Sequence, residues 1–366
     1  MSELTLSETP EWLTANFLRD LLQISCHVEL TSVEYACKKG ENFASKIYRV
    51  KYKSDSDADE NTVIVKSRPF ENNGFSEEFL KKFNVFEKEI ETYKLVDAFE
   101  NILSSSLKKN VILAPKCLKV TKKPTDILII DDLCSKGYEV TKKSTLFGME
   151  KMKIALKKLA QFHAASAIYY ERNGVFDEKY SRGVYNTEMT DIFDQHFDPN
   201  FNFILEFLST WPNVDNKIIE KMKNWRKFIL NELIRSMSPA KDDDKNFNFN
   251  CLNHGDCWLS NILFINDENG NTSDCAFIDF QQCVFTSPAV DLLTLIITSV
   301  NTDIKLQYFD YFVKFYYENL VETLTILGYT DKKIPTLKAF YIDIIDRVMA
   351  TKIHMKNGKL NQIPSI

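Results

Sequence analysis

Two aspartates and one asparagine between residues 251 and 281 have the types and the spacing of a phosphoryl-transfer centre. Asp256 follows an apolar approach, Asn261 comes five positions later, and Asp279 ends the second of two short apolar strands joined by a turn. Such a hairpin would return Asp279 to the side of Asp256 and Asn261. In phosphoryl transfer one Asp accepts the proton of the attacking hydroxyl, while an Asn and a second Asp hold the magnesium ions that bridge the nucleotide phosphates. We therefore predict Asp256, Asn261 and Asp279 as catalytic residues, with Asn261 and Asp279 as the metal ligands.

Two other interpretations of this stretch stay open. Its Asp and Asn residues could only cap the turns of a polar hairpin, although this joint spacing, with apolar strands between, seldom arises by chance. The stretch could also belong to a metallo-phosphoesterase with His254 and Asp256 as ligands. That chemistry needs further clusters of His and Asp, and the five histidines of the chain are scattered, at positions 27, 163, 196, 254 and 354.

The segments HGDCWLSNILF (residues 254–264) and FIDFQ (residues 277–281) resemble the catalytic and metal motifs of the aminoglycoside phosphotransferase and choline kinase superfamily. Within it they are most similar to the insect ecdysteroid kinase-like family, also called CHK kinase-like. The pattern of that family, HGDxWxxNxxF and then IDFQ, includes Trp258 and Gln281. A protein kinase would have Arg in place of Gly255 and Gly in place of Gln281, so we do not expect a protein substrate.

The resemblance covers about residues 30 to 330 and implies an α+β, bilobal protein-kinase-like fold. An N-terminal lobe with an antiparallel sheet and the nucleotide-binding residues would take residues 1–130. A hinge would take residues 131–138. A larger α-helical C-terminal lobe, with the catalytic loop and the substrate pocket, would take residues 139–366.

The N-terminal part has the pattern of a helix followed by an antiparallel meander. Thr9 and Pro10 have the types that begin a helix. Alternating residues then indicate strands near positions 33–37, 48–52 and 62–66. The turn GENFAS, residues 40–45, resembles the phosphate loop of the family, which implies nucleotide contacts for Asn42 and Ser45. On its own it could also be an ordinary hairpin turn.

Lys66 and Glu89 are the predicted pair that positions the nucleotide phosphates. Lys66 ends the third strand-like stretch, and Glu89 borders the apolar face of an amphipathic helix, between Phe86 and Tyr93. Kinases use such a Lys–Glu pair on the α and β phosphates. The alternative is a solvated Lys at a sheet edge and a surface Glu.

The predicted hinge carries two further candidate nucleotide contacts. An apolar strand ends at Asp131, and Leu133 follows before a polar, small-residue stretch. The family has an acidic pair and Leu at this place, which implies that Asp131 and Leu133 lie at the adenine.

Three features of the C-terminal part have a structural and a functional interpretation. His163 lies on an apolar helical stripe, which favours a core histidine over a ligand. An aromatic-rich helical region is either core or one wall of an apolar acceptor pocket, and it comprises Phe193, Phe197, Phe201, Phe203, Phe207 and Trp211. Asp291 falls in the first turn of a helix, where it either compensates the helix dipole or, as the family implies, supports the catalytic loop.

Composition sets the remaining expectations. The chain has 366 residues, 44% apolar and 27% charged, with a net charge of -5, which argues against nucleic-acid binding. We see no signal peptide and no apolar run of the length of a membrane span. Eight cysteines without a CxxC pair indicate reduced thiols. We therefore expect a cytoplasmic monomer without a nucleic-acid partner or a membrane span.

Taken together, these patterns predict a small-molecule kinase that uses ATP and Mg²⁺. The family resemblance implies a small-molecule hydroxyl acceptor, namely an ecdysteroid or a related steroid or xenobiotic alcohol. The alternative is a catalytically silent pseudokinase that binds a hormone or a nucleotide. All four catalytic positions carry the residues that phosphotransfer needs, at Lys66, Asp256, Asn261 and Asp279, and this favours the kinase.

Overall fold

The computed structural model describes residues 9–37, 45–68, 85–142, 145–183, 185–212, 214–240, 248–329 and 334–358. The chain divides into two units. The first comprises Met1–Thr141 and Asn261–Gln281, and the second comprises Lys142–Ser260 and Gln282–Ile366. The predicted lobes, residues 1–130 and 139–366 with a hinge at 131–138, stay predictions. The segment Asn261–Gln281, which lies within the predicted C-terminal lobe, clusters with the first unit.

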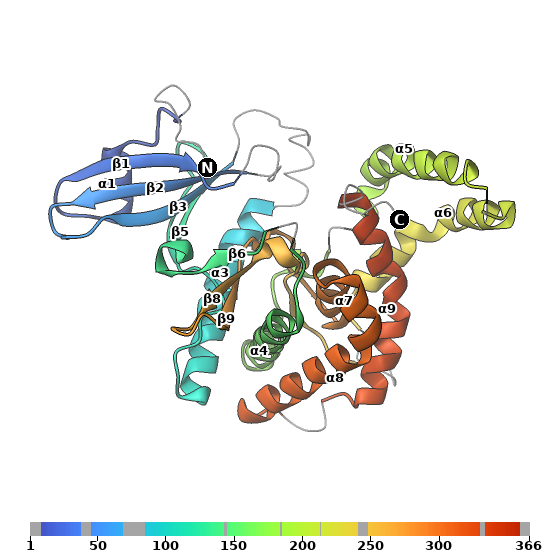
Figure 1. Ribbon diagram of the computed structural model, residues 1–366. Helices are drawn as coiled ribbons and strands as arrows, with labels where there is room; N and C mark the ends of the chain where they lie inside the picture. Colours follow the sequence, from blue (N-terminus) through green and yellow to red (C-terminus); the bar gives the residue numbers. More distant parts are fainter. Residues whose placement is uncertain are drawn as a thin grey trace. The chain divides into compact units, whose positions relative to one another are not determined.

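The first unit contains a five-stranded antiparallel sheet with the strand order β1-β2-β3-β5-β4 (Figure 1). Its strands are β1 (Val28–Tyr35), β2 (Lys46–Ser54), β3 (Asn61–Ser67), β4 (Cys117–Thr121) and β5 (Ile127–Asp131). Alternate side chains of a strand point to opposite faces, and β3 is paired on both sides. Lys66 therefore stands on a central strand and not at the sheet edge that one interpretation proposed.

In the described residues of the first unit, two α-helices accompany this sheet. α1 (Ala15–Leu22) packs on its apolar face, where Leu18 joins Val50 and Val65 in one buried cluster. The N-cap of α1 is Thr14, whose hydroxyl accepts a hydrogen bond from the Phe17 amide at 3.1 Å. The helix start that we predicted at Thr9 was therefore wrong. The longer helix α3 (Val85–Leu107) carries Glu89 on its buried side.

A second, three-stranded sheet explains why the segment Asn261–Gln281 belongs to the first unit. It pairs β6 (Glu139–Val140), β8 (Ile262–Asn266) and β9 (Thr272–Phe277) in the order β6-β8-β9. The turn between β8 and β9 is closed by Asp267, whose carboxylate accepts hydrogen bonds from the amides of Asn269 and Asn271. The predicted hairpin that ends near Asp279 is thus present.

The second unit is mainly helical (Figure 1). Its described residues also include a short pair of strands. Among the described residues, its α-helices are α4 (Met149–Asn173), α5 (Thr190–Ser209), α6 (Asn216–Met237), α7 (Ala289–Ser299), α8 (Thr302–Ile326) and α9 (Leu337–Gly358). The strands β7 (Cys251–Asn253) and β10 (Val284–Thr286) pair antiparallel. The predicted α+β class, with an N-terminal antiparallel sheet and a larger helical C-terminal part, is confirmed. None of the helices in the described part of the chain has the length and apolar character of a membrane span.

α5 and α6 form a helical hairpin that buries part of the aromatic region, which we predicted to be either core or one wall of an acceptor pocket. Phe193, Phe197 and Phe201 are buried between the two helices and stack in sequence, with centroids 4.6 Å and 5.3 Å apart. The structural interpretation therefore holds for these three residues. Phe203 and Phe207, in contrast, are 68% and 52% exposed.

Candidate functional site

Lys66, Glu89 and Asp279 form a charged cluster in the first unit. The Lys66 ammonium donates to Glu89 Oε1 at 2.8 Å and to Asp279 Oδ1 at 2.6 Å. These residues come from β3, α3 and the chain just after β9, so three separate elements bring them together. Lys66 and Glu89 are buried, and the Asp279 carboxylate is 20% exposed. In this cluster the Asp279 carboxylate is therefore the group that solvent can reach, and the Lys66 ammonium that it contacts is buried.

Burial and charge act in opposite directions on this cluster. Burial alone would lower the pKa of Lys66, but the adjacent carboxylates of Asp279 and Glu89 outweigh it and raise that pKa, so the ammonium keeps its proton. Burial raises the pKa of Glu89 to about 7, with Lys66 opposing the rise and Asp279 adding to it. One ammonium does not neutralise two carboxylates, and the more buried Glu89 is the one that takes up a proton near neutral pH.

Asn261 and Asp279 meet at the open end of the β8–β9 hairpin. Ile262 pairs with Phe277, and the Ile278 amide donates to the Asn261 carbonyl at 3.0 Å, so Asn261 lies opposite the residue before Asp279. Asp279 has a left-handed backbone with φ +71°, a conformation that Asp adopts more readily than most residues. Its Oδ2 accepts from the Gln281 side-chain amide at 3.2 Å.

The oxygen donors at this place fit a magnesium ion. Mg²⁺ is commonly bound by one or two carboxylates together with substrate phosphates and water, and it does not require a cage made of protein ligands alone. The partly exposed Asp279 carboxylate is a donor of that kind, and so is the side-chain oxygen of Asn261, whose backbone pairs with the residue before Asp279. In the described residues, three or more His, Cys, Asp or Glu side chains do not gather in a metal-binding arrangement.

In the second unit, Asp291 holds the backbone of the loop that contains Asp256. Asp291 is fully buried in the first turn of α7, and its two carboxylate oxygens accept from the amides of His254 at 2.6 Å and Gly255 at 2.9 Å. The structural support that the family implied is therefore present. Asp256 itself is partly exposed.

His163 forms a hydrogen bond with the Asp291 carboxylate and so helps to hold it in place. Its Nε2 lies 3.1 Å from Asp291 Oδ2, which is an acceptor, so Nε2 carries the proton and Nδ1 accepts from the Tyr316 hydroxyl at 2.6 Å. Burial raises the pKa of Tyr316 well above its usual value, which keeps that hydroxyl a donor. His163 is fully buried, and our interpretation of it as a core histidine is confirmed.

Gly255 is required by a close backbone approach. Its φ is +80°, and a Cβ at this position would lie 2.0 Å from the carbonyl oxygen of Gln282. No side chain fits at this position, which is the physical reason why the residue between His254 and Asp256 is a glycine. The next amide, of Asp256, donates to His254 Nδ1 at 3.3 Å, so the loop is fixed on both sides of the glycine.

The predicted hinge residues have mixed surroundings. Leu133 is buried in a cluster with Tyr138 and Leu263, and Asp131 pairs with Lys136. Sequence analysis missed the neighbouring Asp132, which is buried. Its carboxylate accepts a hydrogen bond at 2.7 Å from Nε of Arg49, a residue of β2. The roles of Asp131 and Leu133 at the adenine stay predictions.

The remaining predicted residues are distributed as follows. Ser45 is buried directly before β2, and Asn42 lies outside the described residues. Asp256 belongs to the second unit and Asn261 and Asp279 to the first, so their joint action stays a prediction.

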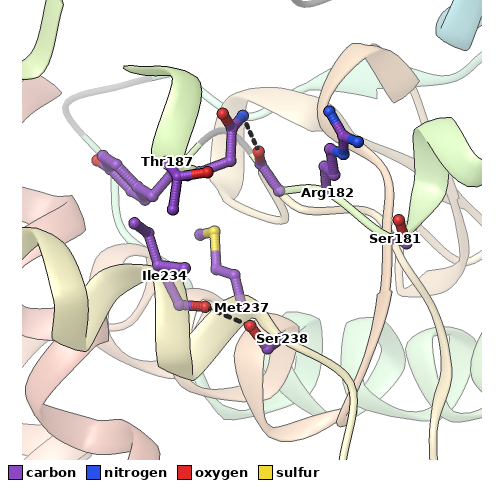
Figure 2. Close-up of a pocket in the computed structure, with 9 residues that line it drawn as sticks. Ser181, Arg182, Thr187, Ile234, Met237 and Ser238 are labelled. Atoms are coloured by element: carbon purple, nitrogen blue, oxygen red, sulfur yellow. Dashed lines mark hydrogen bonds between the residues drawn. The ribbon is translucent and has the colours of Figure 1, made fainter. Parts of the chain in front are cut away.

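One cavity of about 180 Å³ lies in the second unit, between residues 181–187 and the end of α6 (Figure 2). Its polar groups are already engaged: the Asn186 side chain donates to the Gly183 carbonyl, and the Ser238 hydroxyl donates to the Ile234 carbonyl. Pockets for drug-sized ligands have volumes of about 300–1,000 Å³. The cavity is too small for a steroid.

Comparisons with known proteins place the chain in a family. Comparison with curated protein sequences finds no match. Among solved structures, a choline kinase from Cryptosporidium parvum is similar at 10% identity with a TM-score of 0.43, covering 90% of this chain and 81% of that chain. A putative fructosamine-3-kinase from Haemophilus somnus is similar at 12% identity with a TM-score of 0.37, covering 93% and 96%. Both likenesses are too distant to bear on the site. The model of the ecdysteroid kinase-like family, in contrast, matches residues 39–329, and the chain belongs to that family.

Proposed function

We propose that the protein is a small-molecule kinase that transfers the γ-phosphate of ATP to an alcohol. The observation that carries the proposal is the contact of the Lys66 ammonium with both Glu89 and Asp279. A buried lysine held by a helix glutamate, beside an aspartate at the end of a strand, is the arrangement with which kinases position nucleotide phosphates. Membership of the ecdysteroid kinase-like family supports the same activity.

Each residue has a role that follows from its surroundings. Lys66, fixed by Glu89, would bind the phosphates of the nucleotide, and Asn261 and Asp279 would hold magnesium. When bound, Mg²⁺ neutralises charge on the phosphates and fixes their orientation. Asp256 would orient the acceptor hydroxyl and accept its proton as the acceptor oxygen bonds to the γ-phosphorus and ADP leaves.

The loop at Asp256 is suited to this role because it is held rigidly. Asp291 binds the two preceding amides, and Gly255 packs directly on Gln282. Positioning and charge stabilisation supply most of the rate in phosphoryl transfer, so a fixed base is an advantage.

The acceptor class is the part of the proposal that rests on the family alone. We propose an apolar alcohol, an ecdysteroid or a related steroid or xenobiotic, and we expect a monomer that acts in the cytoplasm. The aromatic side chains Phe203 and Phe207 on α5 are exposed and are available to an apolar ligand.

The test is a phosphotransfer assay read by mass spectrometry. Purified protein and Mg-ATP are mixed with ecdysteroids, sterols, choline, aminoglycosides and plant phenolic alcohols, one acceptor at a time. We expect a product that is heavier by one phosphoryl group with the wild type, and none with Asp256→Asn. ATP binding without any product, seen by thermal shift, would favour the pseudokinase. Absence of ATP binding would contradict the proposal.

A further inference from the structure

A buried ion pair on α9 begins a polar network in the second unit. Arg347 Nε donates to Asp343 Oδ1 at 2.8 Å, one helical turn away, and both side chains are 8% exposed. Breaking a buried pair on one side is costly, whereas an apolar pair of similar volume often stabilises a protein equally well. The stability of α9 alone therefore does not explain why charges stand here.

The guanidinium of Arg347 ties α9 to two other elements. Its Nη1 donates to the Ser236 carbonyl, to the Ser238 carbonyl at 3.3 Å and to the Thr286 hydroxyl at 3.2 Å. The Thr286 hydroxyl in turn donates to the Ser238 carbonyl at 2.8 Å. Arg347 thus joins the end of α6 to the end of β10, directly before α7.

Asp343 fixes the start of α7. Its Oδ2 accepts from the Ser287 hydroxyl, and the Ser287 oxygen accepts at 3.1 Å from the amide of Ala289, the first residue of α7. The first turn of α7 contains Asp291. The position of Ser287 therefore sets where the Asp291 carboxylate meets the loop amides.

A second branch reaches the same loop through Asn253. The side-chain amide of Asn253 donates to the Thr286 carbonyl at 3.0 Å, and its oxygen accepts from the Asp291 amide at 3.3 Å. Asn253 directly precedes His254. Thr286, which Arg347 contacts, and Asp291, which Ser287 places, are therefore both bonded to the residue that leads into the HGD loop.

We propose that Arg347 and Asp343 are positioning residues for the catalytic loop. They hold Thr286 and Ser287, and through them Asn253 and Asp291, so that the loop amides stay fixed. In a buried network of this kind each hydrogen bond strengthens its neighbours, and a missing member loosens the rest. The proposal rests on the proposed kinase function only for its kinetic consequence.

Hydrogen exchange of the full-length protein, read by mass spectrometry on peptides that contain residues 252–259, tests the placement of the loop. In the double variant Asp343→Leu/Arg347→Met, the apolar pair replaces the ion pair and preserves folding. Ser287 then loses its hydrogen bond to Asp343, and Thr286 loses the one from Arg347. We expect amide exchange in these peptides to be about ten-fold faster, because local opening becomes easier. Arg347→Lys keeps the positive charge and replaces the double variant in this experiment if the double variant does not fold. For Arg347→Lys we expect amide exchange in these peptides to be about three-fold faster.

Asp346→Asn is the matched control. Asp346 also joins α9 to α6, through Arg235, but this pair is on the surface, with side chains 58% and 46% exposed. We expect no change in loop exchange. Unchanged exchange in the double variant, or in Arg347→Lys where that variant stands in, would overturn the proposal and leave the pair a structural feature of α9.

Kinetics give the second result. With an acceptor that the wild type phosphorylates, we expect kcat of the double variant to fall about ten-fold while KM for ATP changes less than about two-fold, as for loss of positioning in the transition state. A wild type that phosphorylates no acceptor would count against the proposed function alone, because the exchange measurement still decides the role of Arg347 and Asp343.

Discussion

Replacement of Lys66 by Met removes the central charge of the first-unit cluster. The change keeps the apolar stem of the side chain but removes the ammonium that contacts Glu89 and Asp279. Loss of one partner from a buried ion pair costs about 3–5 kcal/mol, because here the Asp279 carboxylate loses its counter-charge and Glu89 must take up a proton. We expect the free energy of unfolding to fall by an amount in this range at pH 8.

The size of this loss should depend on pH in a direction that Glu89 sets. Burial raises the pKa of Glu89 to about 7 in the wild type, and Lys66 opposes that rise. An opposite charge beside a carboxyl lowers its pKa by about 1–3 units, so without Lys66 the pKa of Glu89 should rise by at least about one unit. A carboxyl with a higher pKa in the folded than in the unfolded state lowers stability as pH rises from its unfolded-state pKa to its folded-state pKa. For Glu89 this pH range extends about one pH unit higher in the variant than in the wild type. The destabilisation should therefore be about 1.4 kcal/mol larger at pH 8 than at pH 5.

Urea unfolding followed by circular dichroism at both pH values measures this difference. Lys53→Met, on the exposed side of β2, is the matched control, and we expect it to change stability by less than about 0.5 kcal/mol. In a Glu89→Gln background the pH dependence of the Lys66→Met effect should vanish. Equal destabilisation at pH 5 and pH 8 in the wild-type background would refute the assignment of Lys66 as the counter-charge of Glu89.

Two further predictions concern the loop of the second unit. Gly255→Ala places a Cβ 2.0 Å from the Gln282 carbonyl oxygen. We expect the rate of phosphotransfer to fall at least about ten-fold, as for a misplaced catalytic group. The control is Gly270→Ala, where φ is +81° and no atom lies within 4 Å of the new Cβ; it should lower the free energy of unfolding by only about 1–2 kcal/mol and leave the activity unchanged. Asp291→Asn replaces one of the two accepting carboxylate oxygens by an NH₂ donor, so one of the two loop amides loses its acceptor. We expect the free energy of unfolding to fall by about 1–3 kcal/mol, whereas Asp303→Asn, an exposed first-turn acid of α8, should have little effect in the same urea titration.

The parts of the site that sequence predicted are those with local signals. Asn261 and Asp279 meet because a hairpin with a clear turn joins them, and Glu89 lies on the buried side of a helix whose apolar period was visible. His163 on an apolar stripe is, as expected, a core residue. In each case the element that carries the residue can be recognised from a few neighbouring positions.

The parts that sequence missed depend on partners distant in the chain. Arg49 and Asp132 are 83 positions apart, and no periodic pattern connects them. Arg347 and Asp343 stand four positions apart on a helix, but their spacing is equally typical of a solvated surface pair. The pairing of β6 with β8, which assigns the segment Asn261–Gln281 to the first unit, likewise leaves no trace in spacing.

The most direct test of the central claim is titration calorimetry of ATP with and without Mg²⁺, on the wild type and on Asp279→Asn. If Lys66 binds the phosphates while Asn261 and Asp279 hold the metal, ATP should bind the wild type at least about ten-fold more tightly with Mg²⁺. That gain should disappear in Asp279→Asn, which removes a charged ligand but leaves the fold. Equal affinity with and without Mg²⁺, or a gain that survives in Asp279→Asn, would contradict the account of this site.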